Sequence, residues 1–380
     1  MNTLLISPIQ FFTSQDWDRP FLLSLCLLIS VGLVMVASSS VDFAAFKYND
    51  PWLFVRKQSI FLCLGLLLGL VIICTPLILW EKTAGLLLLF GLILLILVLV
   101  PGIGKVVNGS RRWLSFGPIG IQASEVAKFC LIVFFSSYLA RRRHLVKGQW
   151  LSFFIMVTII GGTVVLLMLE PDFGSSVVIC FTLGVMMFVA GVPILRFLLL
   201  AGLALISLSS IAVLSPYRWE RLVAFMDPWA RQFDSGYQLV QSLIAFGRGE
   251  WFGLGLGNSL QKLFFLPEAH TDFIFAIVAE EFGLIGATAL IVTFALFVQR
   301  IFSFSRKAML ADKPFSSFLC LGIGSMLAMQ AFINMGVASG LLPTKGLTLP
   351  FVSYGGSSLV VTCLFMALVL RVNLELSREH

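Results

Sequence analysis

Ten apolar segments, each long enough to cross a membrane, dominate this chain of 380 residues. A helix needs about 20 apolar residues to span about 30 Å of hydrocarbon. The chain is 59% hydrophobic and only 12% charged, whereas soluble domains carry about 25% charged residues. The sequence therefore predicts one integral membrane domain over residues 1–380, all-α and polytopic. The expected spans are 20–39, 54–75, 83–100, 123–140, 151–169, 173–191, 194–214, 273–299, 315–336 and 351–371.

Lysine and arginine predict the orientation of these spans. A basic run at 141–143 lies between the fourth and fifth spans, and further basic residues at 306–307 lie between the eighth and ninth. Short loops of this kind face the cytoplasm, so with ten spans both termini are expected there too. The longest connection, 215–272, then becomes a large extracytoplasmic loop, and 101–122 and 337–350 face the same side.

The charge and the cysteines exclude several classes of protein. The net charge is +7, but no basic run alternates with exposed aromatic residues, so nucleic acid is not an expected partner. A basic excess is typical of cytoplasmic loops that contact anionic membrane lipids. The seven cysteines lie in apolar segments without C-x-x-C spacing, so neither disulfides nor a cysteine metal site is predicted.

Glu268, His270 and Asp272 lie where a polar loop becomes the eighth span. A carboxylate there is accessible from water, while adjacent apolar groups can raise its pKa, so it can act as a base on a lipid-borne substrate. Two carboxylates and a histidine do not specify a metal, because a hard cation needs about six oxygen ligands. A divalent cation (Mg²⁺ or Mn²⁺) therefore stays an open alternative. A second alternative is that Thr271 or Asp272 caps the helix, with His270 a hydrogen-bonded surface residue.

Glu125 and Lys128 form a second polar group. They are three residues apart in the fourth span and therefore share one helix face. Each unpaired charge would cost about 2.5–3.5 kcal/mol near the bilayer centre, so we expect the two side chains to pair and to face an interior cavity. The alternative is that both lie near the outer interface and extend towards water.

Several motifs follow one another along the expected outer segments. They are Asn-Gly-Ser-Arg-Arg-Trp at 108–113, Gln-Ala-Ser-Glu-Val-Ala-Lys at 122–128, Pro-Tyr-Arg-Trp-Glu-Arg at 216–221, Leu-Pro-Glu-Ala-His-Thr-Asp at 266–272, Leu-Pro-Thr-Lys-Gly-Leu-Thr-Leu-Pro at 342–350 and Ser-Tyr-Gly-Gly-Ser-Ser at 353–358. In this order they resemble the SEDS family (shape, elongation, division and sporulation) over nearly the whole chain. Lys-Gly-Leu-Thr at 345–348 is similar to the division branch of the family.

The resemblance implies an enzyme, a peptidoglycan glycosyltransferase of bacteria. Such an enzyme polymerises lipid II, the undecaprenyl-diphosphate-linked disaccharide peptide, into glycan strands at the outer face of the cytoplasmic (inner) membrane during cell division. The implied partners are a class B penicillin-binding transpeptidase (FtsI-like) and other division proteins.

Within that reaction Asp272 is the expected catalytic base, because a carboxylate commonly removes the proton of a sugar hydroxyl. Glu268 and His270 are expected to bind substrate or orient Asp272, and Glu125 and Lys128 to form a polar wall under the head group. Cations suit the diphosphate. The candidates on the expected outer side are Arg111, Arg112, Arg218, Arg221, Arg248, Lys262 and Lys345. The alternative for any one of them is a solvated loop residue or a contact with a lipid head group.

Ser353 and Ser357 belong to a run of small polar residues that is expected to open the last span. They are candidates for contact with substrate, with close packing of helices as the alternative.

Two other functions stay open. Buried charges and broken helices also suit a flippase that transports lipid II, and a non-catalytic division scaffold would need no base. The polar residues collect on one face of the membrane instead of crossing its midplane, which favours the polymerase.

Overall fold

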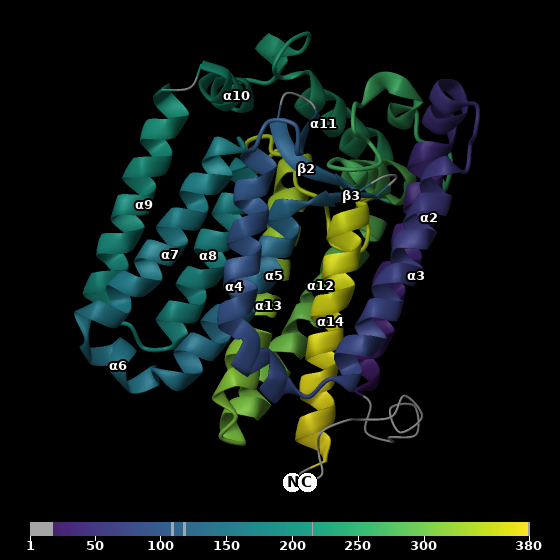
Figure 1. Cartoon of the computed structure of the whole chain (residues 1–380). Helices are drawn as coiled ribbons and strands as arrows, with labels where there is room; N and C mark the ends of the chain where they lie inside the picture. Colours follow the sequence, from purple (N-terminus) through teal and green to yellow (C-terminus); the bar gives the residue numbers. More distant parts are fainter. Residues whose placement is uncertain (1–17, 108–109, 117–118, 215, 379–380) are drawn as a thin grey trace.

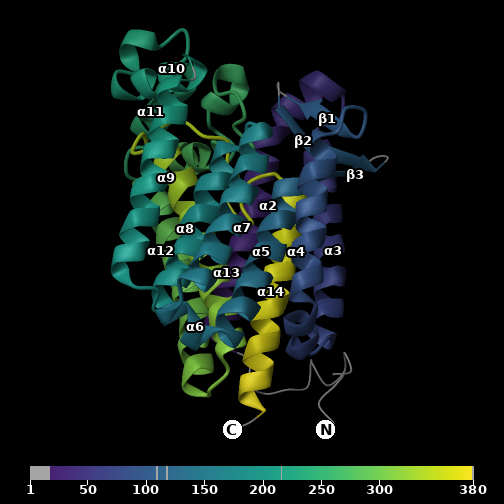
Figure 2. The same ribbon diagram turned by 60° about the vertical axis from the view of Figure 1, so that its left-hand side comes forward.

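The computed structural model describes residues 18–107, 110–116, 119–214 and 216–378, and Figure 1 shows a bundle of long helices lying side by side. Eight described helices are long and apolar enough to cross a membrane: α2 (Arg19–Tyr48), α3 (Leu53–Cys74), α4 (Leu77–Leu99), α5 (Ala123–Arg141), α7 (Trp150–Leu169), α12 (Ile274–Leu310), α13 (Pro314–Ala338) and α14 (Gly356–Ser377). Two further apolar helices, α8 (Phe173–Val189) and α9 (Ile194–Leu214), stand beside them (Figure 2). The predicted polytopic all-α fold is confirmed, while the count of ten spans stays a prediction.

The connections gather at two ends of the bundle (Figure 1). One end, called here the sheet end, carries β1 (Gly104–Val107), β2 (Ser110–Phe116), β3 (Ile119–Gln122), α10 (Pro216–Met226) and α11 (Tyr237–Gly249). The opposite end carries α6 (Arg143–Gly148), the turn between α12 and α13, and the last turn of α14. The chain therefore separates its candidate site segments from its basic turns.

The connection before α5, expected from the sequence to be a plain loop, folds into a small antiparallel sheet of order β1-β2-β3. Trp113 of β2 pairs with Gln122, the last residue of β3, and α5 begins at the next residue. The sheet therefore sets where α5 enters the bundle, and with it the height of Glu125 in the first turn.

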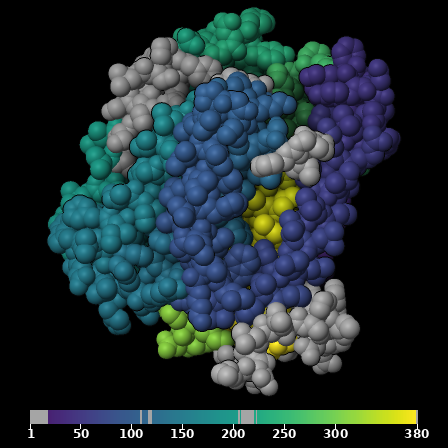
Figure 3. All heavy atoms as spheres, viewed as in Figure 1, coloured from purple at the N-terminus to yellow at the C-terminus, as the bar shows by residue number. Residues whose placement is uncertain are grey.

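Three helices form the centre of the bundle. In the apolar stretches of α5, α13 and α14, 78% of the residues are buried, compared with 22–39% in the other five candidate spans. The outer helices present apolar side chains outwards, as expected for contact with lipid. Figure 3 shows that the face between α3 and α4 is hollowed, so that part of α14 is visible from outside.

Helix α12 is broken where Gly283 adopts a positive φ of 67°. The chain after α11 packs into this break. The amide of Leu254 donates to the carbonyl of Glu280 at 3.0 Å, and the amide of Leu284 donates to the carbonyl of Glu250 at 2.8 Å. Backbone groups freed by the break are thus satisfied inside the protein, as a membrane segment requires.

Candidate active site

The segment that carries Asp272 ends immediately before α12. The helix begins at Ile274 after Phe273, and no side-chain bond caps its first turn among the described residues. Thr271 instead donates its hydroxyl to Glu268 Oε2 at 2.7 Å. The alternative in which Thr271 or Asp272 caps the helix is therefore wrong.

The half-buried carboxylate of Asp272 has an unusual electrostatic environment. Its pKa is raised to about 7, chiefly by burial and also by the nearby carboxylate of Glu268, while the charges of Arg221 and Arg112 oppose the rise. A carboxyl with a pKa near 7 is half ionised at neutral pH. It can therefore accept a proton and give it up again under ordinary conditions.

A strap of residues 344–350, between α13 and α14, passes over this carboxylate. A Cβ added to Gly346 would lie 2.8 Å from Asp272 Oδ2, which is closer than side-chain carbon normally approaches. Glycine at this position lets the strap backbone touch the carboxyl group. The strap therefore supplies part of the burial that raises the pKa of Asp272.

Two amide side chains of α13 hold the strap. Asn334 Nδ2 donates to the carbonyl of Leu347 at 2.6 Å and to the carbonyl of Asp272 at 2.8 Å. One turn away, Gln330 Nε2 donates to the carbonyl of Thr348 at 3.0 Å. Neither amide is among the site residues predicted from the sequence. Polar side chains inside an apolar span are the signal that could have found them.

Ser353 contacts the segment that carries Asp272, and Ser357 contacts β3, although the last span begins later than expected. Ser353 lies before α14, which starts at Gly356, and donates to the carbonyl of Thr271 at 2.5 Å. Ser357 donates to the carbonyl of Gly120 in β3 at 2.9 Å. The expected start of the span at 351 is therefore wrong. Both serines join backbone segments in the structure.

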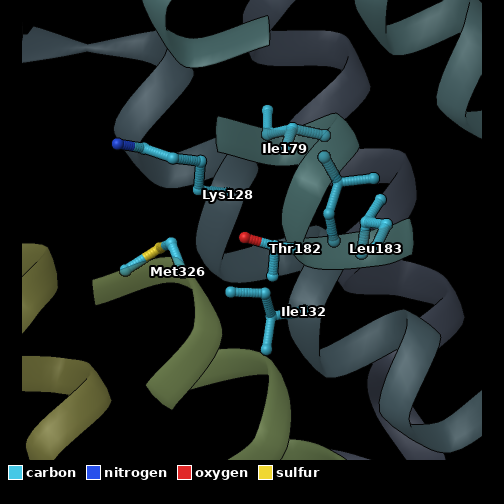
Figure 4. Close-up of a pocket in the computed structure, with 7 residues that line it drawn as sticks. Lys128, Ile132, Ile179, Thr182, Leu183 and Met326 are labelled. Atoms are coloured by element: carbon cyan, nitrogen blue, oxygen red, sulfur yellow. The ribbon is translucent and has the colours of Figure 1, made fainter. Parts of the chain in front are cut away.

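Glu125 and Lys128 form the predicted ion pair, with 2.7 Å between Oε1 and Nζ. Both are buried, at 6% and 1% exposure, so the alternative of two interfacial side chains is wrong. Lys128 Nζ also donates to Gln330 Oε1 at 3.3 Å. The stem of Lys128 lines a small cavity with Thr182 and apolar side chains, and Figure 4 shows its nitrogen pointing away from Thr182.

Three cationic side chains lie around Asp272 or the strap. The charges of Arg221 and Arg112 act on Asp272, and Arg221 Nη1 donates to the carbonyl of Thr344 at 3.3 Å. Lys345 Nζ lies 4.2 Å from the centre of the Phe173 ring. Arg218 lies in α10, but its side chain falls outside the described residues.

Two other candidate cations bind buried glutamates of α12. Lys262 Nζ lies 3.1 Å from Glu281 Oε1, and Arg248 Nε lies 3.4 Å from Glu280 Oε1. Both glutamates are fully buried. These pairs hold the end of α11 and the chain after it against α12, so Lys262 and Arg248 are committed to folding contacts. Arg111 likewise donates to the carbonyl of Leu99 at 3.0 Å.

His270 and Glu268, although two residues apart, lie in different environments. The His270 ring is buried, 4.7 Å from the ring centre of Phe54 and 5.4 Å from that of Phe43, so it is not a surface residue. Burial lowers the pKa of His270, which favours a neutral imidazole. Glu268 is exposed. Within the described ranges no three His, Cys, Asp or Glu side chains are grouped as metal ligands.

The fold and the site together define a class, a polytopic membrane protein with a carboxylate site at one end of its bundle. The chain belongs to the cell cycle protein family of FtsW, RodA and SpoVE, whose family model matches residues 19–378. The resemblance seen in the motifs is therefore confirmed.

Relatives and solved structures agree with this family. The chain is 68% identical to the probable peptidoglycan glycosyltransferase FtsW of Saccharophagus degradans, covering 94% of this chain and 92% of that protein. The protein of the same name from Hahella chejuensis is 48% identical, over 99% of this chain and 94% of the relative.

Two solved structures have the same fold. One belongs to a study of structural coordination of polymerization and crosslinking by a peptidoglycan synthase complex. It is 32% identical with a TM-score of 0.76, covering 96% of this chain and 99% of that chain. The other is the rod shape determining protein RodA of Thermus thermophilus, 27% identical with a TM-score of 0.71, covering 95% of this chain and 98% of that one.

Proposed function

We propose that this protein is a peptidoglycan glycosyltransferase that polymerises lipid II during cell division, with Asp272 as the general base. The enzyme class follows from relatives that carry this name at up to 68% identity over most of the chain. The observation that carries the role of Asp272 is its half-buried carboxyl, with a pKa of about 7, at the sheet end of the bundle.

The chemistry is a displacement at the anomeric carbon of a lipid-linked sugar. Asp272 takes the proton of the acceptor hydroxyl while that oxygen forms a bond to the anomeric carbon. The bond from this carbon to the diphosphate oxygen breaks, and the diphosphate leaves with the bonding electrons. Asp272 then returns its proton to water, and Arg221, Arg112 and Lys345 are the cations we assign to the departing diphosphate.

The remaining candidates have supporting roles in this proposal. Glu268, exposed beside Asp272, contacts the acceptor sugar, and Arg218 adds positive charge from α10. The buried Glu125 and Lys128 hold the floor of the site through Gln330, and do not touch substrate. His270, Ser353 and Ser357 keep the surrounding loops in place. A divalent cation bound with substrate stays an open hypothesis.

We further propose that the sheet end faces outwards from the cytoplasmic (inner) membrane and that both termini are cytoplasmic. Basic residues at the opposite end, in α6 and beside the α12–α13 turn, support this orientation. The segment 215–272 is then the large extracytoplasmic loop of a single membrane domain. The hollow between α3 and α4 in Figure 3 offers the polyprenyl chain an apolar route from the lipid.

The partner in this proposal is a class B penicillin-binding transpeptidase, together with other division proteins. A neighbour in fold belongs to a peptidoglycan synthase complex in which polymerization and crosslinking are coordinated, and this supports a crosslinking partner here. A flippase is less well supported. Its polar path would need to cross the bundle, whereas the candidate site and its cations gather at the sheet end.

The decisive experiment measures glycan strand formation from lipid II by the purified protein with its cognate transpeptidase. Asp272→Asn keeps the shape of the side chain and removes the base. We expect polymer formation to fall by roughly 10²–10⁴-fold, the usual contribution of general base catalysis, with folding and partner binding intact. Full polymerisation by the variant would exclude Asp272 as the base. Movement of labelled lipid II across vesicles without polymer would favour the flippase, and neither activity in the wild-type protein would favour the scaffold.

A further inference from the structure

We infer that Asn334 is a positioning residue for the general base. Its amide joins the backbone of Asp272 to the strap that covers the Asp272 carboxylate. The inference rests on the proposed role of Asp272 and adds a residue that does not touch substrate. Sequence spacing gives no hint of it, since 62 residues separate Asn334 from Asp272.

The geometry uses both protons of one amide group. Asn334 Nδ2 lies 2.8 Å from the carbonyl oxygen of Asp272 and 2.6 Å from that of Leu347. These two carbonyls belong to the two segments that meet at the carboxylate, because Gly346, next to Leu347, is in contact with Asp272 Oδ2. A single side chain therefore sets the distance between the base and its cover.

The amide oxygen of Asn334 indicates that the residue acts through its Nδ2 donors. Asn334 is 1% exposed, and its Oδ1 has no hydrogen-bond partner among the described residues. A buried polar atom that has left water and found no hydrogen-bond partner destabilises the folded state. An apolar residue would avoid this cost inside a membrane helix. The two bonds to Asp272 and Leu347 are the feature of Asn334 that offsets it.

A second side chain of α13, Gln330, also binds the strap. Gln330, one turn earlier on α13, donates to the carbonyl of Thr348 at 3.0 Å and accepts from Lys128 Nζ at 3.3 Å. Lys128 is paired with Glu125. A continuous chain of polar contacts therefore leads from the buried ion pair through α13 to the strap. Asn334 binds the neighbouring strap residue, Leu347, and joins the strap to Asp272.

The test compares Asn334→Ala with Asn373→Ala in the full-length protein with its transpeptidase partner and lipid II. Asn373 is also a buried asparagine, but it lies near the C-terminal end of α14, at the end of the bundle opposite the sheet. A displacement of about 1 Å at a reacting group can cost on the order of 10²-fold in rate. We expect kcat of Asn334→Ala to fall by that order while the KM for lipid II changes little. Asn373→Ala is expected to keep wild-type kinetics.

A pH profile separates positioning from a general loss of structure. Without Asn334 the strap is released and water reaches Asp272, so the acid limb of kcat is expected to move below pH 7. A variant that only lost folded protein would keep the limb in place. Asn334→Thr retains one donor for the two carbonyls, so an intermediate kcat is expected. This second variant tests the inference if Asn334→Ala does not fold.

Two results would overturn the inference. One is wild-type kcat and pH profile in Asn334→Ala. The other is a loss of activity that follows the fraction of folded protein and leaves the acid limb unshifted. Asp272→Asn distinguishes this failure from failure of the proposed function. If Asp272→Asn is inactive and Asn334→Ala behaves like Asn373→Ala, only the positioning role fails, whereas an active Asp272→Asn removes the base assignment itself.

Discussion

Gly346 touches the carboxylate of Asp272, so closely that a Cβ on the glycine would lie 2.8 Å from Oδ2. The two residues are far apart in the chain and come from different connections at the sheet end. The contact covers the carboxyl group and contributes to the burial that raises its pKa to about 7. A small change at Gly346 should therefore alter the position and the pKa of the proposed base without changing the Asp272 side chain itself.

Gly346→Ala is expected to lower kcat by on the order of 10-fold to 10²-fold, because the new methyl group pushes the carboxylate from its position. The measurement is the rate of glycan strand formation from lipid II. Gly85→Ala in α4 is the matched control, since a Cβ there meets nothing within 4 Å. Equal rates for the two variants would mean that the contact has no effect on the base.

The rate of polymerisation should depend on pH through Asp272. Because burial raises the pKa of Asp272 to about 7, the base is mostly protonated below this pH and ionised above it. We expect kcat to rise with pH through about 7 and then to level off. One pH unit below the pKa, about a tenth of the sites are ionised, so the rate at pH 6 should be roughly tenfold below the plateau. A rate that is constant from pH 5 to pH 8 would contradict this.

Glu170 predicts a pH dependence of stability. Its side chain is fully buried, and neither carboxylate oxygen has a partner among the described residues. Its pKa is raised to about 8, chiefly by burial and also by the charge of Asp172, against the opposing charge of Arg112. Protonated Glu170 suits the folded state, so its favourable contribution is complete below the ordinary pKa of about 4.3 and is lost as pH rises through about 8.

Glu170→Gln should therefore gain thermal stability over the wild-type protein between pH 5 and pH 9. The measurement is the unfolding midpoint in detergent at several pH values. Glu220→Gln, at an exposed position in α10, is the control and should show no such trend. A difference between Glu170→Gln and wild type that stays the same at every pH would argue against a buried, neutral Glu170.

The ion pair between Glu125 and Lys128 should matter more for stability than a surface pair. Lys128→Met leaves Glu125 buried without its partner, which typically costs about 3–5 kcal/mol. Arg141→Met removes an exposed partner of Glu81, and exposed pairs contribute about 0–1 kcal/mol. Thermal unfolding in detergent compares the two variants directly.

Exchange of the two charges tests the pairing itself. Glu125→Lys combined with Lys128→Glu should recover part of the stability and of the polymerisation lost in each single variant. The contact with Gln330 keeps the recovery incomplete, because Gln330 Oε1 then faces a carboxylate instead of the ammonium group that now donates to it. A double variant no better than the single ones would show that the charges do not act as a pair.

The sequence led directly to the helical fold and to part of the site. Segments of about 20 apolar residues have few alternatives to a membrane helix, because lipid offers backbone groups no hydrogen bonds. The same reasoning predicted that Glu125 and Lys128 pair, and placed Asp272 at the border of a helix and a loop. The sheet before α5 was missed, since its short strands carry no long apolar pattern.

The roles of the cations could not be separated from sequence. Lys262 and Lys345 both lie in polar connections, yet Lys262 Nζ is buried in an ion pair with Glu281 of α12, whereas Lys345 Nζ lies over the ring of Phe173. That pairing depends on how the chain after α11 packs into the break at Gly283. Neither residue spacing nor composition carries this information.

By itself, then, the sequence determined a polytopic membrane protein of this family and the segment that carries the proposed base, because lipid solvation and local motifs act over short stretches of chain. Only the tertiary structure decided what surrounds Asp272. The strap at Gly346 and the amide of Asn334 reach it from 74 and 62 residues further along the chain. Such contacts arise from packing between distant elements, and it is this packing that buries the carboxyl and raises its pKa.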